Sequence, residues 1–229
     1  MMEEKKFSME NNQNPENKEQ LMEIEEAEIE NVPGIFSVLN ENLLPMELLD
    51  KEKGGLYLKN TGKKIEDFSE KGFLVNSFSE EELKDVLLDR EKNITLIAKE
   101  NNEIVGYALA YNLEKWRKCK PDWEKRVELN DEKEKQMFEK KNILYFRHIA
   151  TKQSSKNKSV GAMLEYKMFS VAIQKGYKEI IGEALEHPIE NKASINFNKK
   201  IGFKKMGKVK EIKNENELIW GLYKKNLEK

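Results

Sequence analysis

The chain has 229 residues, of which 38 % are hydrophobic and 36 % charged, with 41 Lys and Arg nearly balancing 42 Asp and Glu. This length suits one sizeable α/β domain with a heavily solvated exterior. The near-neutral balance argues against nucleic acid as a partner, because nucleic-acid-binding domains carry a clustered basic excess. No apolar run approaches the ~18–20 residues of a membrane span, and no signal-peptide layout opens the chain, so we expect a cytoplasmic protein with no membrane partner.

The first part of the chain predicts a tail, an edge strand and a helix. Residues 1–20 are polar and rich in Asn and Glu, which is typical of a disordered tail, and 21–229 are expected to form a single domain. The apolar alternation over 21–27 predicts an edge strand, and the apolar spacing over 35–43 predicts a helix. The charged, glycine-containing stretch 51–71 predicts a loop that includes some helix.

A short strand and a second helix are expected next. Phe73-Leu74-Val75 is apolar enough for a short strand. Ser79 followed by Glu82 forms a capping box, which marks the start of a helix. The apolar stripe of that helix is Leu83, Val86 and Leu87.

The clearest β-hairpin lies between residues 94 and 110. Two β-rich runs, 94–98 and 104–110, are joined through Asn101-Asn102, residues that tolerate positive φ in a tight turn. The charged insertion at about 115–141 is too long for a simple connection, so it predicts a helical excursion or loop on the substrate side. It contains the lone Cys119, which can form no internal disulfide. Its basic neighbours are of the kind that lower a thiol pKa, but a surface thiol is the favoured interpretation.

The second half is more regular. An apolar central strand is predicted at 143–150, and a helix follows with apolar positions from Val160 to Ala172 and a stop at Gly176. A strand at 180–184 comes next. The order strand–helix–strand implies a parallel pair of strands joined by a crossover helix. The chain then predicts a helix at 192–201 ended by Gly202 and strands at 203–212 and 218–224.

A phosphate-binding segment is predicted where the central strand meets its helix. The N-terminus of a helix offers free N–H groups and the positive end of the macrodipole, and small residues let a phosphate approach. Lys156 and Lys158 add positive charge. An ordinary loop with Ser159 as N-cap is the alternative. The predicted cradle consists of Lys156, Asn157, Lys158, Ser159, Val160, Gly161 and Ala162.

Two motifs together resemble the GNAT superfamily of N-acetyltransferases. The first is the coenzyme A loop Gln/Arg-x-x-Gly-x-Gly/Ala, matched by Lys156, Ser159 and Gly161. The second is Asn-x-x-Ala-x-x-Leu-Tyr-x-Lys-x-Gly-Phe, matched from Asn191 to Phe203. The resemblance implies an α/β (α+β) fold, with a GNAT-like mixed central sheet, a β-hairpin, a splayed parallel strand pair and flanking helices. It also implies acetyl-CoA as co-substrate and no metal.

The sequence departs from the family pattern at two positions. Ser159 replaces the first glycine, where positive φ is harder to adopt. Asn198 stands where the family has Tyr, the usual proton donor to the leaving thiolate, and an amide is a poor acid. Catalysis then needs another donor, such as water or a nearby Tyr.

The resemblance implies direct attack of a primary amine on the thioester. The coenzyme would pair with the free edge of the central strand at Ile149, Ala150 and Thr151, and would receive hydrogen bonds from Asn191 and contacts from Asn198. Because an amine of pKa about 10 is mostly protonated at neutral pH, a base is required. Glu183 and His148 are the candidate bases, although a packed histidine and a solvated strand end are the alternatives for them.

The sequence therefore predicts an acetyl-CoA-dependent N-acetyltransferase acting on a small-molecule or protein amine, as a monomer or homodimer. A non-catalytic acyl-CoA-binding regulatory module is the alternative, motivated by Asn198. A nucleotide-binding domain is disfavoured, because the chain contains neither a Gly-Lys-Ser/Thr loop nor a full Gly-x-Gly-x-x-Gly fingerprint.

Overall fold

The computed structural model describes residues 22–44, 49–52, 55–58, 66–155, 159–213 and 216–227. The tail expected at 1–20 lies outside these residues, as do Lys156, Asn157 and Lys158 of the predicted cradle. The helices and strands, including three 3₁₀ helices (η), are in chain order β1 (Met22–Glu26), η1 (Ile29–Asn31), α1 (Val32–Asn42), β2 (Leu49–Glu52), β3 (Gly55–Leu58), α2 (Glu66–Ser69), α3 (Glu80–Leu88), β4 (Ile94–Glu100), β5 (Glu103–Asn112), α4 (Leu113–Cys119), η3 (Glu124–Arg126), β6 (Val127–Leu129), η4 (Glu132–Glu139), β7 (Ile143–Thr151), α5 (Val160–Gln174), β8 (Glu179–His187), α6 (Lys192–Lys200), β9 (Lys204–Lys213) and β10 (Asn216–Asn226).

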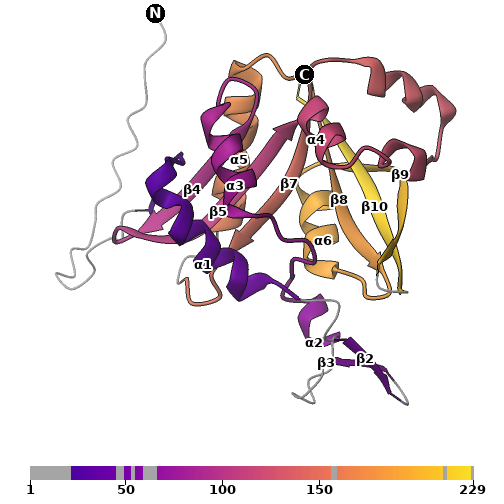
Figure 1. Cartoon of the computed structure of the whole chain (residues 1–229), viewed down its shortest axis with the longest axis horizontal. Coiled ribbons are helices and arrows are strands. Elements are labelled where there is room, and N and C mark those ends of the chain that lie inside the picture. Colours follow the sequence, from indigo (N-terminus) through magenta and orange to yellow (C-terminus); the bar gives the residue numbers. More distant parts are fainter. Residues whose placement is uncertain are drawn as a thin grey trace, which may run out of the picture.

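One mixed sheet carries the fold, with helices on both of its faces (Figure 1). Its eight strands run in the order β1-β4-β5-β7-β8-β10-β9-β6, and β2 and β3 form a separate two-stranded sheet. Helices α1, α3 and α4 pack with one face in one apolar cluster, and α5 and α6 pack with the other face in a second cluster. We call these the α4-side face and the α5-side face. The mixed α/β architecture expected from the sequence is confirmed.

The turn, the helix cap and the edge strand predicted in the first half of the chain are all present in the structure. Asn101 and Asn102 have φ of 50° and 66°, which closes the β4–β5 hairpin. The Ser79 hydroxyl accepts a 3.0 Å hydrogen bond from the Glu82 amide and so caps α3. Strand β1 forms one edge of the sheet, as its alternating pattern predicts.

Two predictions between residues 49 and 75 are wrong. The stretch expected to be loop with some helix contains the β2–β3 hairpin, although α2 agrees with the helix expected there. The strand expected at 73–75 is reduced to a single parallel bridge between Leu43 and Leu74. Phe73 and Val75 are nevertheless buried, at 5 % and 7 % exposure, because they pack in the cluster of the α4-side face. Their apolar character reflects this packing and not pairing in a sheet.

The charged segment 115–141 is built into the molecule. It begins in α4, and its short strand β6 pairs antiparallel with β9 at the far edge of the main sheet. Trp116 and Trp123 are 3 % and 1 % exposed, so a few apolar side chains anchor an otherwise charged stretch in the core. The segment therefore forms part of the α4-side face.

The strand–helix–strand unit of the second half is confirmed. Strands β7 and β8 are parallel and adjacent, and α5 connects them. Gly176 and Gly202 have φ of 82° and 90° just after α5 and α6, the left-handed conformation that ends a helix most easily at glycine. Helix α5 lies close to β5, because a Cβ on Gly106 would stand 2.9 Å from Val160 Cγ1 and 3.1 Å from Leu164 Cδ1.

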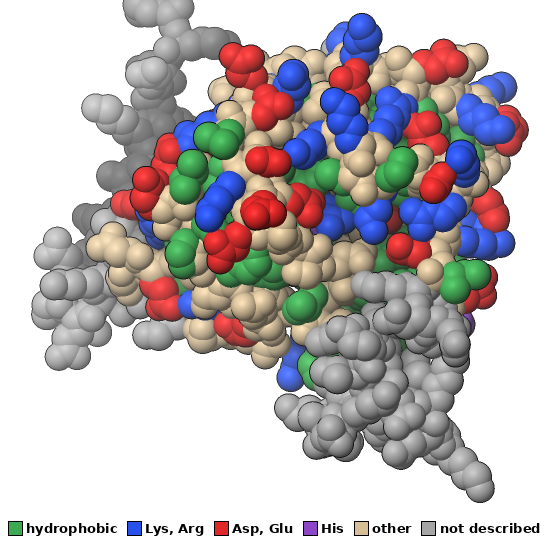
Figure 2. Space-filling view, in the orientation of Figure 1, with side chains coloured by type: hydrophobic (Ala, Val, Ile, Leu, Met, Phe, Trp, Pro, Cys, Tyr) green, Lys and Arg blue, Asp and Glu red, His purple; other side chains and the backbone are tan. Residues whose placement is uncertain are grey.

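Acidic and basic side chains are interspersed over the face of the molecule drawn in Figure 2. Ion pairs join separate strands of the sheet, such as Lys205 with Glu186 at 2.7 Å and Lys210 with Glu128 at 2.7 Å. In the part of the chain that the structure describes, no helix has the length and apolar character needed to cross a membrane.

Candidate active site

The two central parallel strands separate halfway along their length. Strand β7 pairs with β8 from Ile143 opposite Glu179 to Phe146 opposite Gly182 and no further. On its other side β7 has a β-bulge, because Leu109 of β5 pairs with His148 while Ala110 pairs with Phe146. The bulge places Arg147 at the point where the strands diverge. Bulges of this kind bend a strand and redirect its side chains, which is why they recur beside functional sites.

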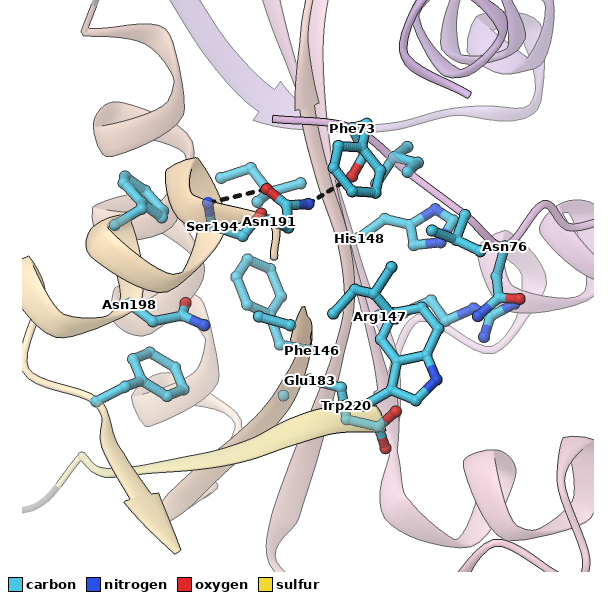
Figure 3. Close-up of a pocket in the computed structure, with 18 of the residues that line it drawn as sticks. Phe73, Asn76, Phe146, Arg147, His148, Glu183, Asn191, Ser194, Asn198 and Trp220 are labelled. Carbon is cyan, nitrogen blue, oxygen red and sulfur yellow. Dashed lines mark hydrogen bonds between the residues drawn. The ribbon is translucent and has the colours of Figure 1, made fainter. Parts of the chain in front are cut away.

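A cavity occupies this opening and reaches both faces of the sheet (Figure 3). On the α5-side face its walls include Phe146, Phe197 and Asn198. On the α4-side face they include Arg147, Glu183 and Trp220. Two groups that approach from opposite faces can therefore meet between β7 and β8.

Glu183 is the most strongly perturbed acid of this cavity. Burial raises the pKa of its carboxyl to about 7, although hydrogen bonds from the Trp123 indole and the Tyr145 hydroxyl and the nearby charge of Arg147 lower it. Desolvation disfavours the charged form, while the donors favour it. The balance leaves a carboxyl that changes charge near neutral pH, as a general base at this pH requires.

His148, the other base expected from the sequence, lies on the same cavity but is enclosed. It is 7 % exposed, and its ring centroid is 5.3 Å from that of Phe78. Its Nδ1 lies 3.2 Å from the Tyr107 hydroxyl. Burial, with the charge of Arg147, holds the pKa of His148 well below its usual range. The imidazole is therefore neutral and packed among aromatic rings.

A groove leads from the cavity along β7 to the start of α5. Ile149, Ala150 and Thr151 line it together with Gly161, and its far end is bounded by Gln153 and Val160. The Thr151 carbonyl accepts a 3.1 Å hydrogen bond from Asn42 Nδ2, so one acceptor on this edge is already used. The groove brings together the end of β7 and the start of α5, the two segments that the sequence assigned to coenzyme binding.

The beginning of α5 needs no glycine at the position of Ser159. Ser159 has φ of −93° and ψ of −2°, which any residue adopts, and its side chain does not cap the helix. Among the residues that the structure describes, a Cβ added to Gly161 would meet only Phe197 Cζ, at 4.0 Å. Val160 is buried beneath the helix start, and Ala162 is partly exposed. A ligand phosphate could approach the helix at Gly161.

Asn191 and Asn198 lie on α6 beside the cavity. The Asn191 side chain caps α6, because its Oδ1 accepts from the Ser194 amide at 3.2 Å, and its Nδ2 donates to the Phe73 carbonyl at 2.8 Å. Figure 3 shows both bonds. Asn191 thus fixes the helix to the segment that carries Phe73. Asn198 lines the wall beside Phe197.

The sequence did not identify three residues that shape the site. Trp123 and Tyr145 bond the Glu183 carboxylate, and Arg147 lies across from it on β7. Alternation along the strand could have placed Tyr145 and Arg147 near Glu183. No local signal could have placed Trp123, which is 60 positions away in the chain.

Cys119 is an exposed residue, as expected. Its basic neighbours do not lower the pKa of its thiol. Partial desolvation of the sulfur and the negative charge of Glu82 raise that pKa instead.

Comparisons with known proteins agree with this geometry. The family model described as "Acetyltransferase (GNAT) family" matches residues 63–203. An N-acetyltransferase from Staphylococcus aureus Mu50 has a similar structure, with a TM-score of 0.57 and 16 % identity over 91 % of this chain and 99 % of that one. YncA of Salmonella typhimurium, solved with its cofactor acetyl-CoA, gives a TM-score of 0.57 and 15 % identity over 91 % and 95 %. A search of curated proteins finds no match.

Proposed function

The chain belongs to the GNAT acetyltransferase family, whose members use acetyl-CoA, and on this premise we propose that it moves an acetyl group to a primary amine by direct attack. The acceptor is a small molecule or a protein, and the protein works in the cytoplasm as a monomer or homodimer, without nucleic acid or membrane as a partner. One observation carries the proposal. Glu183, with a carboxyl pKa of about 7, faces the opening between β7 and β8 from which the coenzyme groove begins.

The residues along the groove fit acetyl-CoA. In the described part of the chain only Phe197 comes within 4.0 Å of a Cβ placed on Gly161, which leaves room for a pyrophosphate, and the edge of β7 beyond Phe146 is not paired with β8, so its backbone can bond the pantetheine amides. Asn191 and Asn198 stand on the opposite wall. Bound there, acetyl-CoA supplies an activated acyl group at the opening between the strands.

Glu183 removes the proton that blocks the amine. An alkyl ammonium has a pKa of about 10, and its nitrogen has no free lone pair. It therefore cannot attack the thioester until a base removes the proton. Trp123 and Tyr145 hold the carboxylate in place on the α4-side face. The acceptor then reaches the thioester from the face opposite α5. Much of the rate is expected to come from this alignment of the two reactants.

The leaving thiol does not require the missing tyrosine at Asn198. Alkyl thiols such as that of cysteine have a pKa of about 8.5, so the sulfur can depart as a thiolate and take its proton from water. Tyr145 is a poorer source than water, because burial raises its pKa and its hydroxyl is bonded to the Glu183 carboxylate. Asn198 still favours the alternative that the protein binds acyl-CoA as a non-catalytic regulatory module.

One experiment separates the two. Thiol release from acetyl-CoA is measured over a panel of amines and peptides, beside calorimetric titration of coenzyme A. We expect tight binding and amine-dependent release, with kcat of Glu183→Gln lowered about 10²- to 10⁴-fold. Glu186→Gln is the matched control, because Glu186 lies on the same strand but is paired with Lys205. Binding without any release supports the regulatory module, and no binding refutes both functions.

A further inference from the structure

Arg147 is a positive charge at the candidate active site that forms no ion pair with any described residue. Its side chain is partly buried at the β-bulge and lines the cavity on the same face of the sheet as Glu183. Among the residues that the structure describes, no carboxylate lies within ion-pairing distance of its guanidinium. Removing an ion from water without a counter-ion is costly, so such a charge is usually balanced by a partner.

The guanidinium is held in a fixed position. Its Cζ lies 4.8 Å from the Trp116 ring centroid, and Trp116 in turn stacks on Tyr145 with centroids 4.0 Å apart. Its Nη2 donates to the Ser77 carbonyl at 3.1 Å. These contacts engage one face and one nitrogen of the group. The Nε is buried without a hydrogen-bond partner in the described part of the chain. The contacts position the charge but do not neutralise it.

A second unsatisfied donor belongs to the same cavity wall. Trp220 is 9 % exposed, and its indole Nε1 has no acceptor among the described residues. Figure 3 draws Arg147, Trp220 and Glu183 around one cavity. The Arg147 guanidinium and the Trp220 indole can donate to an anionic group, and the Glu183 carboxylate can accept from an ammonium. Together they are complementary to an acetyl acceptor that carries both groups.

We propose, as a refinement that rests on the proposed acetyltransferase function, that the acceptor carries an anionic group close to its amine and that Arg147 binds this group. Arg147 and Glu183 are each one residue beyond the last paired residues of β7 and β8. Neighbouring strands are about 4.8 Å apart where they pair, so both ends of one small zwitterion can be engaged together. A planar guanidinium suits a carboxylate or a phosphate, and either gives the charge-assisted bonds required.

The test compares matched acceptors that differ in charge. Glycine and β-alanine are paired with glycinamide and β-alaninamide, and 2-aminoethyl phosphate is paired with 2-aminoethanol. With wild-type protein we expect kcat/KM to favour the anionic member by roughly 10- to 100-fold, the ratio given by one charged hydrogen bond. The carboxylate and phosphate arms show which anion is preferred. Equal kcat/KM for charged and neutral members overturns the proposal.

Variants then assign the preference to one residue. In Arg147→Gln the charged-to-neutral ratio falls to near one, and in Arg147→Lys part of it is retained. Because the ratio is taken within one protein, partial loss of folded protein does not change it. Arg90→Gln is the control, since Arg90 is a partly exposed arginine already paired with Glu28. A ratio that survives in Arg147→Gln also overturns the proposal.

A binding measurement keeps this inference distinct from the proposed function. The same pairs are titrated calorimetrically into protein saturated with coenzyme A. If no amine releases thiol, the acetyltransferase function fails, yet tighter binding of the anionic member that is lost in Arg147→Gln still supports the site. If neutral amines are acetylated and the anionic ones show no advantage in rate or binding, only the role of Arg147 is refuted.

Discussion

Glu165 of α5 is a buried acid whose effect on stability can be measured directly. It is 1 % exposed, and neither carboxylate oxygen has a hydrogen-bond partner among the described residues. Burial raises its pKa from 4.5 to about 8, and the charge of Lys225 only partly opposes this. The folded protein therefore holds the Glu165 proton at neutral pH, whereas the unfolded chain releases it.

The sign and size of the effect follow from linkage. A group with a raised folded pKa contributes stability that is fully present below its unfolded pKa and is lost as pH rises through its folded pKa. For Glu165 the loss spans pH 4.5 to about 8. Each pKa unit corresponds to about 1.4 kcal/mol, so the loss is complete near pH 8 and removes on the order of 5 kcal/mol from the free energy of unfolding.

The perturbation is Glu165→Gln, which keeps the shape of the side chain and removes its titration. Urea unfolding followed by circular dichroism from pH 5 to pH 9 gives the free energy of unfolding of both proteins. We expect near-equal stability at pH 5 and a growing advantage for the variant, several kcal/mol at pH 9. Glu80→Gln, at an exposed helical site paired with Lys84, is expected to parallel the wild type. Parallel curves for Glu165→Gln and wild type would refute the reasoning.

Three further outcomes are expected. Gly161→Glu abolishes calorimetric binding of coenzyme A, because it adds negative charge to the groove. Gly161→Ala, whose Cβ lies 4.0 Å from Phe197, binds coenzyme A nearly normally. Equal affinities of the two variants for coenzyme A contradict a phosphate site at the start of α5. The logarithm of kcat/KM rises with pH with a slope near 1 below pH 7 and levels off above it, because Glu183 must be ionised to take the proton of the ammonium, and a Glu183→Gln variant that keeps this rise contradicts its role as base. Asn191→Ala lowers the free energy of unfolding by about 1–3 kcal/mol in urea titrations, since it leaves the Phe73 carbonyl unsatisfied, and a loss below about 0.5 kcal/mol contradicts its structural role.

The elements that local chemistry determines were predictable from the sequence. The Asn101-Asn102 turn requires positive φ, Ser79 offers a capping oxygen, and Gly176 ends a helix in the left-handed conformation. Each of these preferences acts between residues close in the chain. The order strand–helix–strand around α5 likewise specified a parallel pair, because the crossover leaves few alternatives. The strand predicted at Phe73–Val75 was wrong, because buried loop residues and strand residues share the same apolar composition.

The sequence alone also placed Gly161 and Glu183 on the segments that form the groove and the cavity. Only the tertiary structure decided what these segments can do. The β-bulge at Arg147 depends on register against β5, which no local pattern specifies. The pKa of Glu183 depends on burial and on Trp123, which reaches it from the charged insertion. Register and desolvation are set by residues distant in the chain, and for that reason the chemistry of the site emerges only when β7, β8 and the insertion are packed together.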